Sequence, residues 1–325
     1  MQEIIVGKND AGQRIDKFIM KKYKNIPFSL VYKLIRKKKI TLNKKRTEPN
    51  MILSEGDKLL IFAPDDLLNS SEKRDYTAAV KDIDVVFEDE NVLIAYKPSG
   101  LLVHSDESGN ASDTLIDRII GYLISKQEYD PETENSFAPA LCNRIDRNTE
   151  GLVIAAKNAS ALREMNAIIK NRDIKKVYLA AVHGVIAPPD GKISLLLEKD
   201  PQSNTVHVKT KRTSPAVKSA LTQYRTVSVS ADKNLSLVEV VLITGRTHQI
   251  RVSFAHIGHP LLGDGKYAVN KADRAIGYDS QALCAYRITF GDLSDYALLS
   301  YLSGKTFESR KPDFLKLFDQ KPFNI

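Results

Sequence analysis

The sequence predicts an α+β protein built from two unequal parts. The first is a small N-terminal domain of two helices and a short sheet. The second is a large, mainly antiparallel mixed sheet with flanking helices. Two early segments, residues 13–24 and 29–38, carry apolar side chains at helical spacing. From residue 83 onwards, β-rich runs dominate. They do not alternate with helices as a doubly wound parallel sheet requires, which favours a mixed sheet.

The N-terminal domain is expected to occupy residues 1–65. Ser29 is the predicted N-cap of its second helix, because a serine hydroxyl accepts a hydrogen bond from a free amide of the first helical turn. Short strands are predicted at residues 40–42 and 58–62. The stretch that follows is polar and shows no clear period, so residues 66–80 are predicted to be a linker.

The remaining residues, 81–325, should form the second domain. Its predicted elements are, in order, strands at 83–89 and 91–96, a turn at 97–100, a strand at 101–104, helices at 113–126 and 160–170, strands at 177–182 and 235–243, and a short helix at 313–318. An apolar fraction of 42% is enough for a hydrophobic core in a chain of 325 residues.

Positive charge is concentrated at the N-terminus. Residues 1–65 hold 15 basic and 7 acidic side chains, which accounts for the whole net charge of +8. Such a basic domain on a neutral body indicates a polyanion-binding module. Its densest part is two clusters on either side of one predicted strand: Arg36, Lys37, Lys38 and Lys39, then Lys44, Lys45 and Arg46 in a basic turn at 43–46. A basic run is usually a solvated face, but two clusters around one strand predict a continuous phosphate-binding patch.

Composition excludes several classes of protein. Two cysteines, Cys142 and Cys284, cannot supply a zinc cluster or a disulfide framework, and they suit a reducing compartment. The first residues hold too short an apolar run for a signal peptide, and no segment approaches the ~20 apolar residues of a membrane span. We therefore expect a cytoplasmic protein without a membrane partner, and a monomer.

A charged turn at residues 143–149 holds Asp146 between Arg144 and Arg147, directly before an apolar β-type run. Opposite charges within a few ångströms favour the ionised carboxylate, and an ionised carboxylate held in place can act as a nucleophile. An ordinary surface turn with a local ion pair would have the same pattern.

Two further segments carry candidate site residues. Tyr178 lies on the predicted strand at 177–182, where a lone tyrosine is usually a core residue whose hydroxyl finds a partner. Residues 244–252 are predicted to be extended, so that Ile250 and Arg251 point to opposite faces. As an isolated pattern, this segment could be an edge strand with a hydrogen-bonded histidine.

Taken together, these motifs resemble those of the RluA-type pseudouridine synthases. Residues 143–152 are similar to the family's His-Arg-Leu-Asp-Arg-x-Thr-Ser-Gly-Leu, with Asn143, Ile145 and Glu150 in place of histidine, leucine and serine. The chain also has the family's Lys-Pro-x-Gly turn at 97–100, a tyrosine at 178, and Gly-Arg-x-His-Gln-Ile/Leu-Arg at 245–251. Residues 13–62 resemble the small RNA-binding module shared with ribosomal protein S4, which is independent support.

The resemblance implies an isomerase that breaks the uridine N1–C1′ bond and rejoins the base through C5, without a cofactor or a metal. Asp146 would attack the uridine at the sugar or at the base. Tyr178 would line the uracil pocket, with Tyr178 or a water accepting the C5 proton, and Arg251 would pair with Asp146. Arg144 or Arg147 would fill the space of the flipped base, and His248 would contact the RNA. The expected partner is large-subunit (23S-type) ribosomal RNA or its assembly precursor.

Other functions stay open at this point. One is a synthase acting on tRNA, and another is a non-catalytic ribosome-assembly factor that uses the same fold to bind RNA. A methyltransferase should show a glycine-rich donor loop in a βαβ unit, and a zinc deaminase should show His-x-Glu and Cys-x-x-Cys. The sequence has neither pattern.

Overall fold

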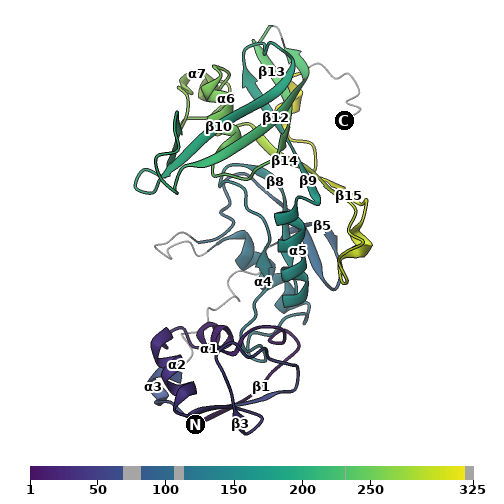
Figure 1. The fold of residues 1–325 in the computed structure, drawn as a ribbon. Coiled ribbons are helices and arrows are strands. Elements are labelled where there is room, and N and C mark those ends of the chain that lie inside the picture. Colours follow the sequence, from purple (N-terminus) through teal and green to yellow (C-terminus); the bar gives the residue numbers. More distant parts are fainter. Residues whose placement is uncertain (69–81, 106–112, 231, 319–325) are drawn as a thin grey trace. The chain divides into compact units, whose positions relative to one another are not determined.

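The computed structural model describes residues 1–68, 82–105, 113–230 and 232–318 (Figure 1). The predicted α+β class is confirmed. The chain divides into two compact units. The first combines residues 1–82 with 116–140 and 156–163, and the second holds residues 83–115, 141–155 and 164–325. Each unit therefore gathers segments that are separate along the chain, whereas the predicted domains, residues 1–65 and 81–325, are each continuous.

The N-terminal part of the first unit is a four-stranded antiparallel sheet with two helices. The sheet has the order β1-β4-β2-β3. Its elements are β1 (Gln2–Ile5), α1 (Ile15–Lys22), α2 (Phe28–Arg36), β2 (Ile40–Leu42), β3 (Lys45–Arg46) and β4 (Lys58–Ile61). The predicted helices bury their apolar stripes, with Ile15, Phe18 and Ile19 packed in the same core as Val31 and Leu34.

Three local predictions in this region were wrong. Pro27, not Ser29, is the N-cap of α2, and the ring of proline fixes an extended entry into the helix with φ −65° and ψ 140°. The basic turn is shorter than predicted, because Lys45 and Arg46 form β3 and pair with β2. The segment predicted as a linker begins with α3 (Asp65–Leu68), whose Leu68 is buried in the N-terminal core. The rest of that segment, residues 69–80, lies outside the described residues.

The N-terminal part is tied to a distant segment of its own unit. Asp10 is 1% exposed, and its carboxylate accepts hydrogen bonds from Asn135 Nδ2 at 2.8 Å and Ser136 Oγ at 2.6 Å. The Ala11 carbonyl accepts from Arg163 at 3.3 Å. The same unit takes in residues 116–125 of α4 (Leu115–Ser125). Removing residues 1–65 would therefore leave part of this unit without its partners.

Among the described residues, the second unit is organised around a large mixed sheet of eleven strands. The main path runs β11-β10-β12-β13-β9-β14-β8-β6-β5, while β15 pairs with β14 and β7 pairs with β8. The strands are β5 (Asp84–Glu88), β6 (Val92–Lys97), β7 (Ala140–Leu141), β8 (Glu150–Ala156), β9 (Ile174–His183), β10 (Asp190–Asp200), β11 (Thr205–Lys209), β12 (Lys218–Ser230), β13 (Leu235–Leu242), β14 (Leu283–Phe290) and β15 (Thr306–Glu308). Most pairs are antiparallel, as predicted.

The pair of β8 and β14 is parallel, and it fixes where the charged turn lies. β8 pairs with β14, with Gly151 opposite Ala285. Gly151 has φ +114°, and a Cβ at this position would lie 2.3 Å from the Ala285 carbonyl oxygen. Only glycine allows this approach. The strand that begins directly after the turn at 143–149 is thereby held in the middle of the sheet.

The helices are α5 (Ala159–Asn171), α6 (Gln249–His256), α7 (Lys271–Ala275) and the 3₁₀ turns η2 (Ser300–Leu302) and η3 (Asp313–Leu317). Val252 of α6 packs with Leu197, Val206 and Ala220 of β10, β11 and β12, and Figure 1 shows α6 beside these strands. Among the described residues, no helix combines the length and the apolar character that crossing a membrane requires.

Two predicted strands of this unit are absent. Residues 101–104 contribute only an isolated bridge at Leu102. Residues 244–252 form a turn followed by α6, because Gln249 Oε1 accepts hydrogen bonds from Thr244 Oγ1 at 2.8 Å and from the Arg246 amide at 3.0 Å. These local bonds close the turn from which the helix starts. The hairpin strands β10, β11 and β12 were not predicted.

Candidate active site

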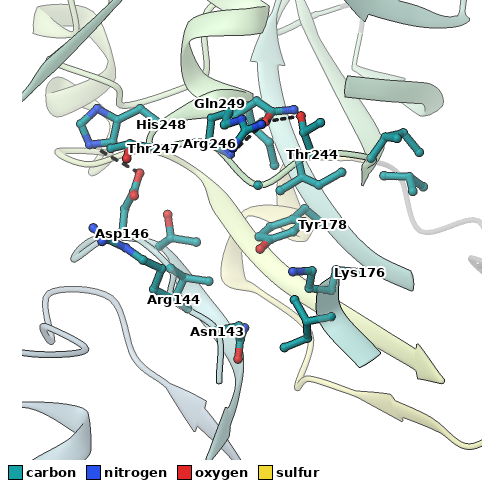
Figure 2. Close-up of a pocket in the computed structure, with 18 of the residues that line it drawn as sticks. Asn143, Arg144, Asp146, Lys176, Tyr178, Thr244, Arg246, Thr247, His248 and Gln249 are labelled. Carbon is teal, nitrogen blue, oxygen red and sulfur yellow. Dashed lines mark hydrogen bonds and ion pairs between the residues drawn. The ribbon is translucent and has the colours of Figure 1, made fainter. Parts of the chain in front are cut away.

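A cavity of about 800 Å³ opens in the second unit (Figure 2). Its walls are the charged turn from Cys142 to Thr149, the end of α5 with the start of β9, and the chain from the end of β13 to Arg251. The sequence-predicted residues Arg144, Asp146, Tyr178, His248 and Arg251 all line it. Segments about 100 residues apart in the chain thus meet at one site. Arg147 is not among the lining residues.

The turn that carries Asp146 is held by the Lys-Pro-Ser-Gly segment at 97–100. The Asp146 carbonyl accepts from the Thr149 amide at 3.0 Å. The Arg147 carbonyl accepts from both the Gly100 amide at 3.0 Å and Lys97 Nζ at 2.8 Å. In return, Arg147 Nε donates to the Gly100 carbonyl at 3.0 Å. The position of the Asp146 backbone therefore depends on a second loop.

Lys97 is a fully buried cation at the centre of this arrangement, with 0% exposure. Its ammonium donates to three carbonyls, those of Pro98, Leu101 and Arg147, each at 2.8 Å. Burial lowers the pKa of Lys97 to about 7, although the negative charges of Asp146 and Glu150 act in the opposite direction. Three acceptors match the three N–H donors of an ammonium, so the side chain binds the two loops together.

Replacing this lysine should destabilise the protein. Lys97→Met keeps the length of the side chain but removes the donor to the Pro98 and Leu101 carbonyls, while the Arg147 carbonyl keeps the Gly100 amide. We expect the free energy of unfolding to fall by at least about 2 kcal/mol, because each unsatisfied buried group costs roughly 1–3 kcal/mol. Chemical denaturation monitored by circular dichroism measures the change. Lys199→Met, at an exposed position of β10, is the matched control and should unfold like wild type.

The difference between wild type and Lys97→Met should also depend on pH. The pKa of Lys97 falls from 10.5 to about 7 on folding, so between these values the unfolded chain binds more protons. Stability then rises with pH, since the cost of burying the charge is present in full below about pH 7 and disappears towards the unfolded pKa. The advantage of wild type should therefore grow between about pH 7 and pH 10. An advantage that shrinks over this range would contradict the argument.

Arg251 joins two carboxylates. Its Nη1 donates to Asp146 Oδ2 at 3.2 Å, which is the contact that the sequence predicts. Its Nε and Nη2 bind the two oxygens of Asp264 at 2.7 and 2.8 Å. Burial disfavours the charge of Arg251, but the hydrogen bonds and charge of Asp264, with Asp146 in addition, outweigh it and raise the pKa of Arg251. Burial likewise opposes the charge of Asp264, and Arg251 outweighs it, so the pKa of Asp264 is lowered.

His248 faces Asp146 as a neutral side chain. It has φ +51°, in the left-handed region, at the N-cap of α6, and its Nε2 lies 3.9 Å from Asp146 Oδ2 (Figure 2). Burial lowers the pKa of His248 to about 4, against the attraction of Asp146. On its other side, Nδ1 lies 2.7 Å from the Tyr267 hydroxyl, which accepts from the Val206 amide at 2.9 Å. Tyr267 therefore fixes the ring that faces Asp146.

The arginines on either side of Asp146 do not pair with it, which corrects the expectation from the sequence. Arg144 lines the cavity as an exposed side chain, and Arg147 is exposed and bonded to Gly100. Within the described part of the chain, the cation that contacts Asp146 is Arg251. The cation therefore comes from a helix in a distant segment and not from the neighbours of Asp146 in the sequence.

Tyr178 is 6% exposed and its ring projects into the cavity (Figure 2). Burial, followed by the charge of Asp146, raises the pKa of Tyr178. The phenol is therefore protonated at neutral pH, and it presents an aromatic face together with an O–H donor. In this state it is suited to packing against a base and not to accepting a proton.

Two positions that depart from the family motif have structural roles. Asn143 Oδ1 accepts from the Ile154 amide at 2.7 Å, which fastens the start of the charged turn to β8. The Glu150 carboxylate accepts a hydrogen bond from the Tyr96 hydroxyl of β6. Both side chains hold the turn to the neighbouring strands.

The two basic clusters predicted to bind phosphate lie in the first unit. All seven are exposed: Arg36, Lys37, Lys38, Lys39, Lys44, Lys45 and Arg46. They stand at the end of α2 and on the hairpin of β2 and β3, so a single strand separates the two clusters, as predicted. Within the described residues, no ion pair neutralises them.

Asp264 and Tyr267 were not predicted as site residues. The signal available was a carboxylate in the tight stretch Gly263-Asp264-Gly265, where Gly263 has φ +78° and lies too close to the Ser280 backbone for a Cβ. A spacing of 13 residues between Arg251 and Asp264 carries no regular period, so only the folded structure brings them together.

Residues 91–256 match the family model of RNA pseudouridylate synthase, and residues 13–59 match that of the S4 domain. An uncharacterized RNA pseudouridine synthase of Mycoplasma genitalium is 34% identical over 316 residues, covering 95% of both chains. The ribosomal large subunit pseudouridine synthase C of Buchnera aphidicola is 34% identical over 82% of this chain and 81% of its own. That of Yersinia pestis is 32% identical over 85% and 82%.

Among solved structures, human RNA pseudouridylate synthase domain containing 1 superimposes with a TM-score of 0.54 and 20% identity, covering 76% of this chain and 89% of its own. At this identity the likeness concerns the fold.

Proposed function

The chain belongs to the RNA pseudouridylate synthase family and carries an S4 domain, and from this premise we propose that it isomerises specific uridines of large-subunit ribosomal RNA with Asp146 as the nucleophile. The protein is an RNA-binding isomerase. The proposed substrate is supported by relatives named as ribosomal large subunit synthases. A cytoplasmic location, expected from the sequence, suits an enzyme of ribosomal RNA.

The observation that carries the proposal is the contact of Asp146 with Arg251 inside the cavity. A carboxylate placed beside a fixed cation is held in one position before substrate arrives, which is electrostatic preorganisation. Its partner Asp264 fixes the guanidinium from the opposite side. Asp146 is thus held at the cavity by Arg251 and Asp264 as well as by the hydrogen bonds of its own turn.

In the proposed reaction the target uridine leaves its stack and enters the cavity, at a cost of a few kcal/mol that protein contacts offset. Asp146 attacks the uridine and forms a covalent bond to it, the N1–C1′ bond breaks, and the base turns so that C5 joins C1′. The bond to Asp146 then breaks and the free carboxylate is restored. N1 ends with a proton and C5 loses one. Arg144, at the exposed rim of the cavity, is placed to fill the space that the base leaves.

The protonated state of Tyr178 favours one of the two proton acceptors that the sequence left open. A phenol whose pKa is raised by burial and by Asp146 stays neutral at physiological pH, so we assign proton removal from C5 to a water. Tyr178 then supplies the aromatic surface against which the uracil packs.

The function is tested by mapping pseudouridines in total RNA from cells with and without the gene. We expect one or more sites in large-subunit ribosomal RNA to be lost in the deletion strain and restored by the wild-type gene. Loss of pseudouridines in tRNA alone would instead indicate a pseudouridine synthase that acts on tRNA. An unchanged map would support a non-catalytic role in ribosome assembly.

The basic clusters of the S4 domain should set RNA affinity and its salt dependence. In full-length protein, replacing lysines 37, 38, 39 and 44 with glutamine should weaken binding of long RNA and flatten the log–log salt slope. Each lost phosphate contact lowers that slope by roughly 0.7–0.9. Fluorescence anisotropy across a salt series measures both quantities. The folded catalytic cavity is untouched, so turnover of a short RNA substrate should stay near wild type.

A matched variant controls for net charge. Lysines 271, 305, 311 and 316 are exposed and lie outside both the S4 domain and the cavity lining. Replacing these four with glutamine removes the same charge and should leave the salt slope within error of wild type. If the log–log salt slope falls equally in both variants, the S4 clusters have no special part in RNA binding.

A further inference from the structure

One wall of the cavity is strongly basic. The end of α5 and the start of β9 contribute four cationic lining residues, Lys170, Arg172, Lys175 and Lys176. The acid of this segment, Asp173, is not among the lining residues and accepts a hydrogen bond from the Tyr296 hydroxyl at 2.6 Å. Within the described lining, Asp146 is the single carboxylate, and Arg251 already binds it. The wall therefore carries a net positive charge that faces the cavity.

Lys176 is the innermost of these cations. It stands two residues before Tyr178 on β9, so the two side chains point to the same face of the strand. Figure 2 shows both of them projecting into the cavity. Lys170, Arg172 and Lys175 are exposed, whereas Lys176 is only partly exposed. Burial lowers the pKa of Lys176, and no acceptor for its ammonium is found among the residues that the structure describes.

Lys176 Nζ is not among the buried side-chain atoms that lack a hydrogen-bond partner, so it reaches the solvent of the cavity. A lysine ammonium in this position serves as a point charge for phosphate. The Cα atoms of residues 176 and 178 are separated by about 7 Å, the span of two residues in a strand. A uracil packed on Tyr178 therefore places its own nucleotide's phosphate, or the next one, within reach of Lys176.

We propose that the wall from Lys170 to Lys176 is a phosphate-binding subsite for the RNA strand beside the target uridine, with Lys176 as its inner contact. This subsite deepens the proposed function and rests on it. The exposed cations at 170, 172 and 175 continue the track from Lys176 towards solvent, where the strand enters. The subsite is separate from the S4 clusters, which bind RNA at exposed positions of the other unit.

The test uses full-length protein and a fluorescein-labelled nonaribonucleotide with one central uridine among adenosines. Two further RNAs each carry a neutral methylphosphonate in place of one phosphate that flanks the uridine, on the 5′ side in one RNA and on the 3′ side in the other. The nucleotides at these positions carry a 2′-O-methyl group in all RNAs, the parent included. We expect wild type to bind one of these RNAs about tenfold more weakly than the parent. Lys176→Met should bind that RNA and the parent equally, because it has already lost the contact. Lys176→Arg, which keeps the charge, should recover discrimination.

Two controls make the result specific. A methylphosphonate three nucleotides from the uridine should have the same effect on wild type and on Lys176→Met. Lys305→Met removes an exposed lysine outside the cavity and should discriminate like wild type. The subsite is refuted if Lys176→Met distinguishes the methylphosphonate RNA from the parent as strongly as wild type does. It is also refuted if wild type binds these RNAs equally.

The proposed function fails in a different way. Discrimination at Lys176 without any isomerisation would refute the activity and leave the subsite intact, while isomerisation without discrimination would refute the subsite alone.

Discussion

Asp146→Asn should abolish isomerisation while leaving the fold and RNA binding intact. The amide is isosteric with the carboxylate and can still accept a hydrogen bond from Arg251 Nη1, but it lacks the anionic oxygen that attacks the uridine. We expect the rate to fall by at least about 10⁴-fold, since removing a nucleophile costs on the order of 10⁴–10⁶ in other enzymes. Release of tritium from RNA labelled at uridine C5 measures turnover.

The fold of this variant is checked by thermal unfolding, and RNA binding by anisotropy. Asp295→Asn makes the same chemical change at an exposed position outside the cavity and should keep wild-type turnover. If Asp146→Asn turns over within a few-fold of wild type, Asp146 is not the nucleophile, and the assignment of the whole cavity would have to be revised.

Arg251→Met should lower both stability and activity. The change leaves the carboxylate of Asp264, whose side chain is 1% exposed, buried without its partner. Breaking a buried ion pair in this way costs roughly 3–5 kcal/mol. Activity falls for a separate reason, because Asp146 loses the cation that fixes it. Denaturant unfolding and tritium release measure the two effects independently.

Asp264→Asn separates these contributions. It keeps the contact between Arg251 and Asp146 while removing the charge of the second carboxylate. The double variant with Arg251→Met should be less destabilised than the two single changes added together, because one interaction is lost in both. Arg225→Met, which removes the exposed partner of a 3.5 Å ion pair with Glu239, is the control and should cost no more than about 1 kcal/mol. Wild-type stability and turnover in Arg251→Met would show that the network has no function.

The pH dependence of this variant follows from the direction of the shift at Asp264. Its pKa is lowered in the folded protein by Arg251, so its stabilising effect is fully present above the unfolded value of 3.8 and is lost as pH falls through the folded value. The stability advantage of wild type over Arg251→Met should therefore be constant near neutral pH and decrease in acid. An advantage that increases on acidification would contradict the ion pair.

The sequence by itself determined the fold class, and it predicted Asp146, Tyr178 and Arg251 as site residues, all three of which line the cavity. The helices α1 and α2 were predictable because their apolar side chains recur at helical spacing. The strands β8 and β9 were predictable because each contains a continuous run of apolar and β-branched residues. The placement of Asp146 directly before a buried strand is also local. These features depend on residues that are neighbours in the chain.

Only the tertiary structure decided which groups surround Asp146. Residues 244–252 were predicted to be extended, but the hydrogen bonds of Gln249 close a turn and start α6, so Arg251 reaches Asp146 from a helix. The pairing of Arg251 with Asp264 and the contact of His248 with Tyr267 leave no periodic signal. The three carbonyls around Lys97 come partly from a loop 50 residues away. Such contacts arise from the packing of separate segments, and a pattern read along one segment cannot contain them.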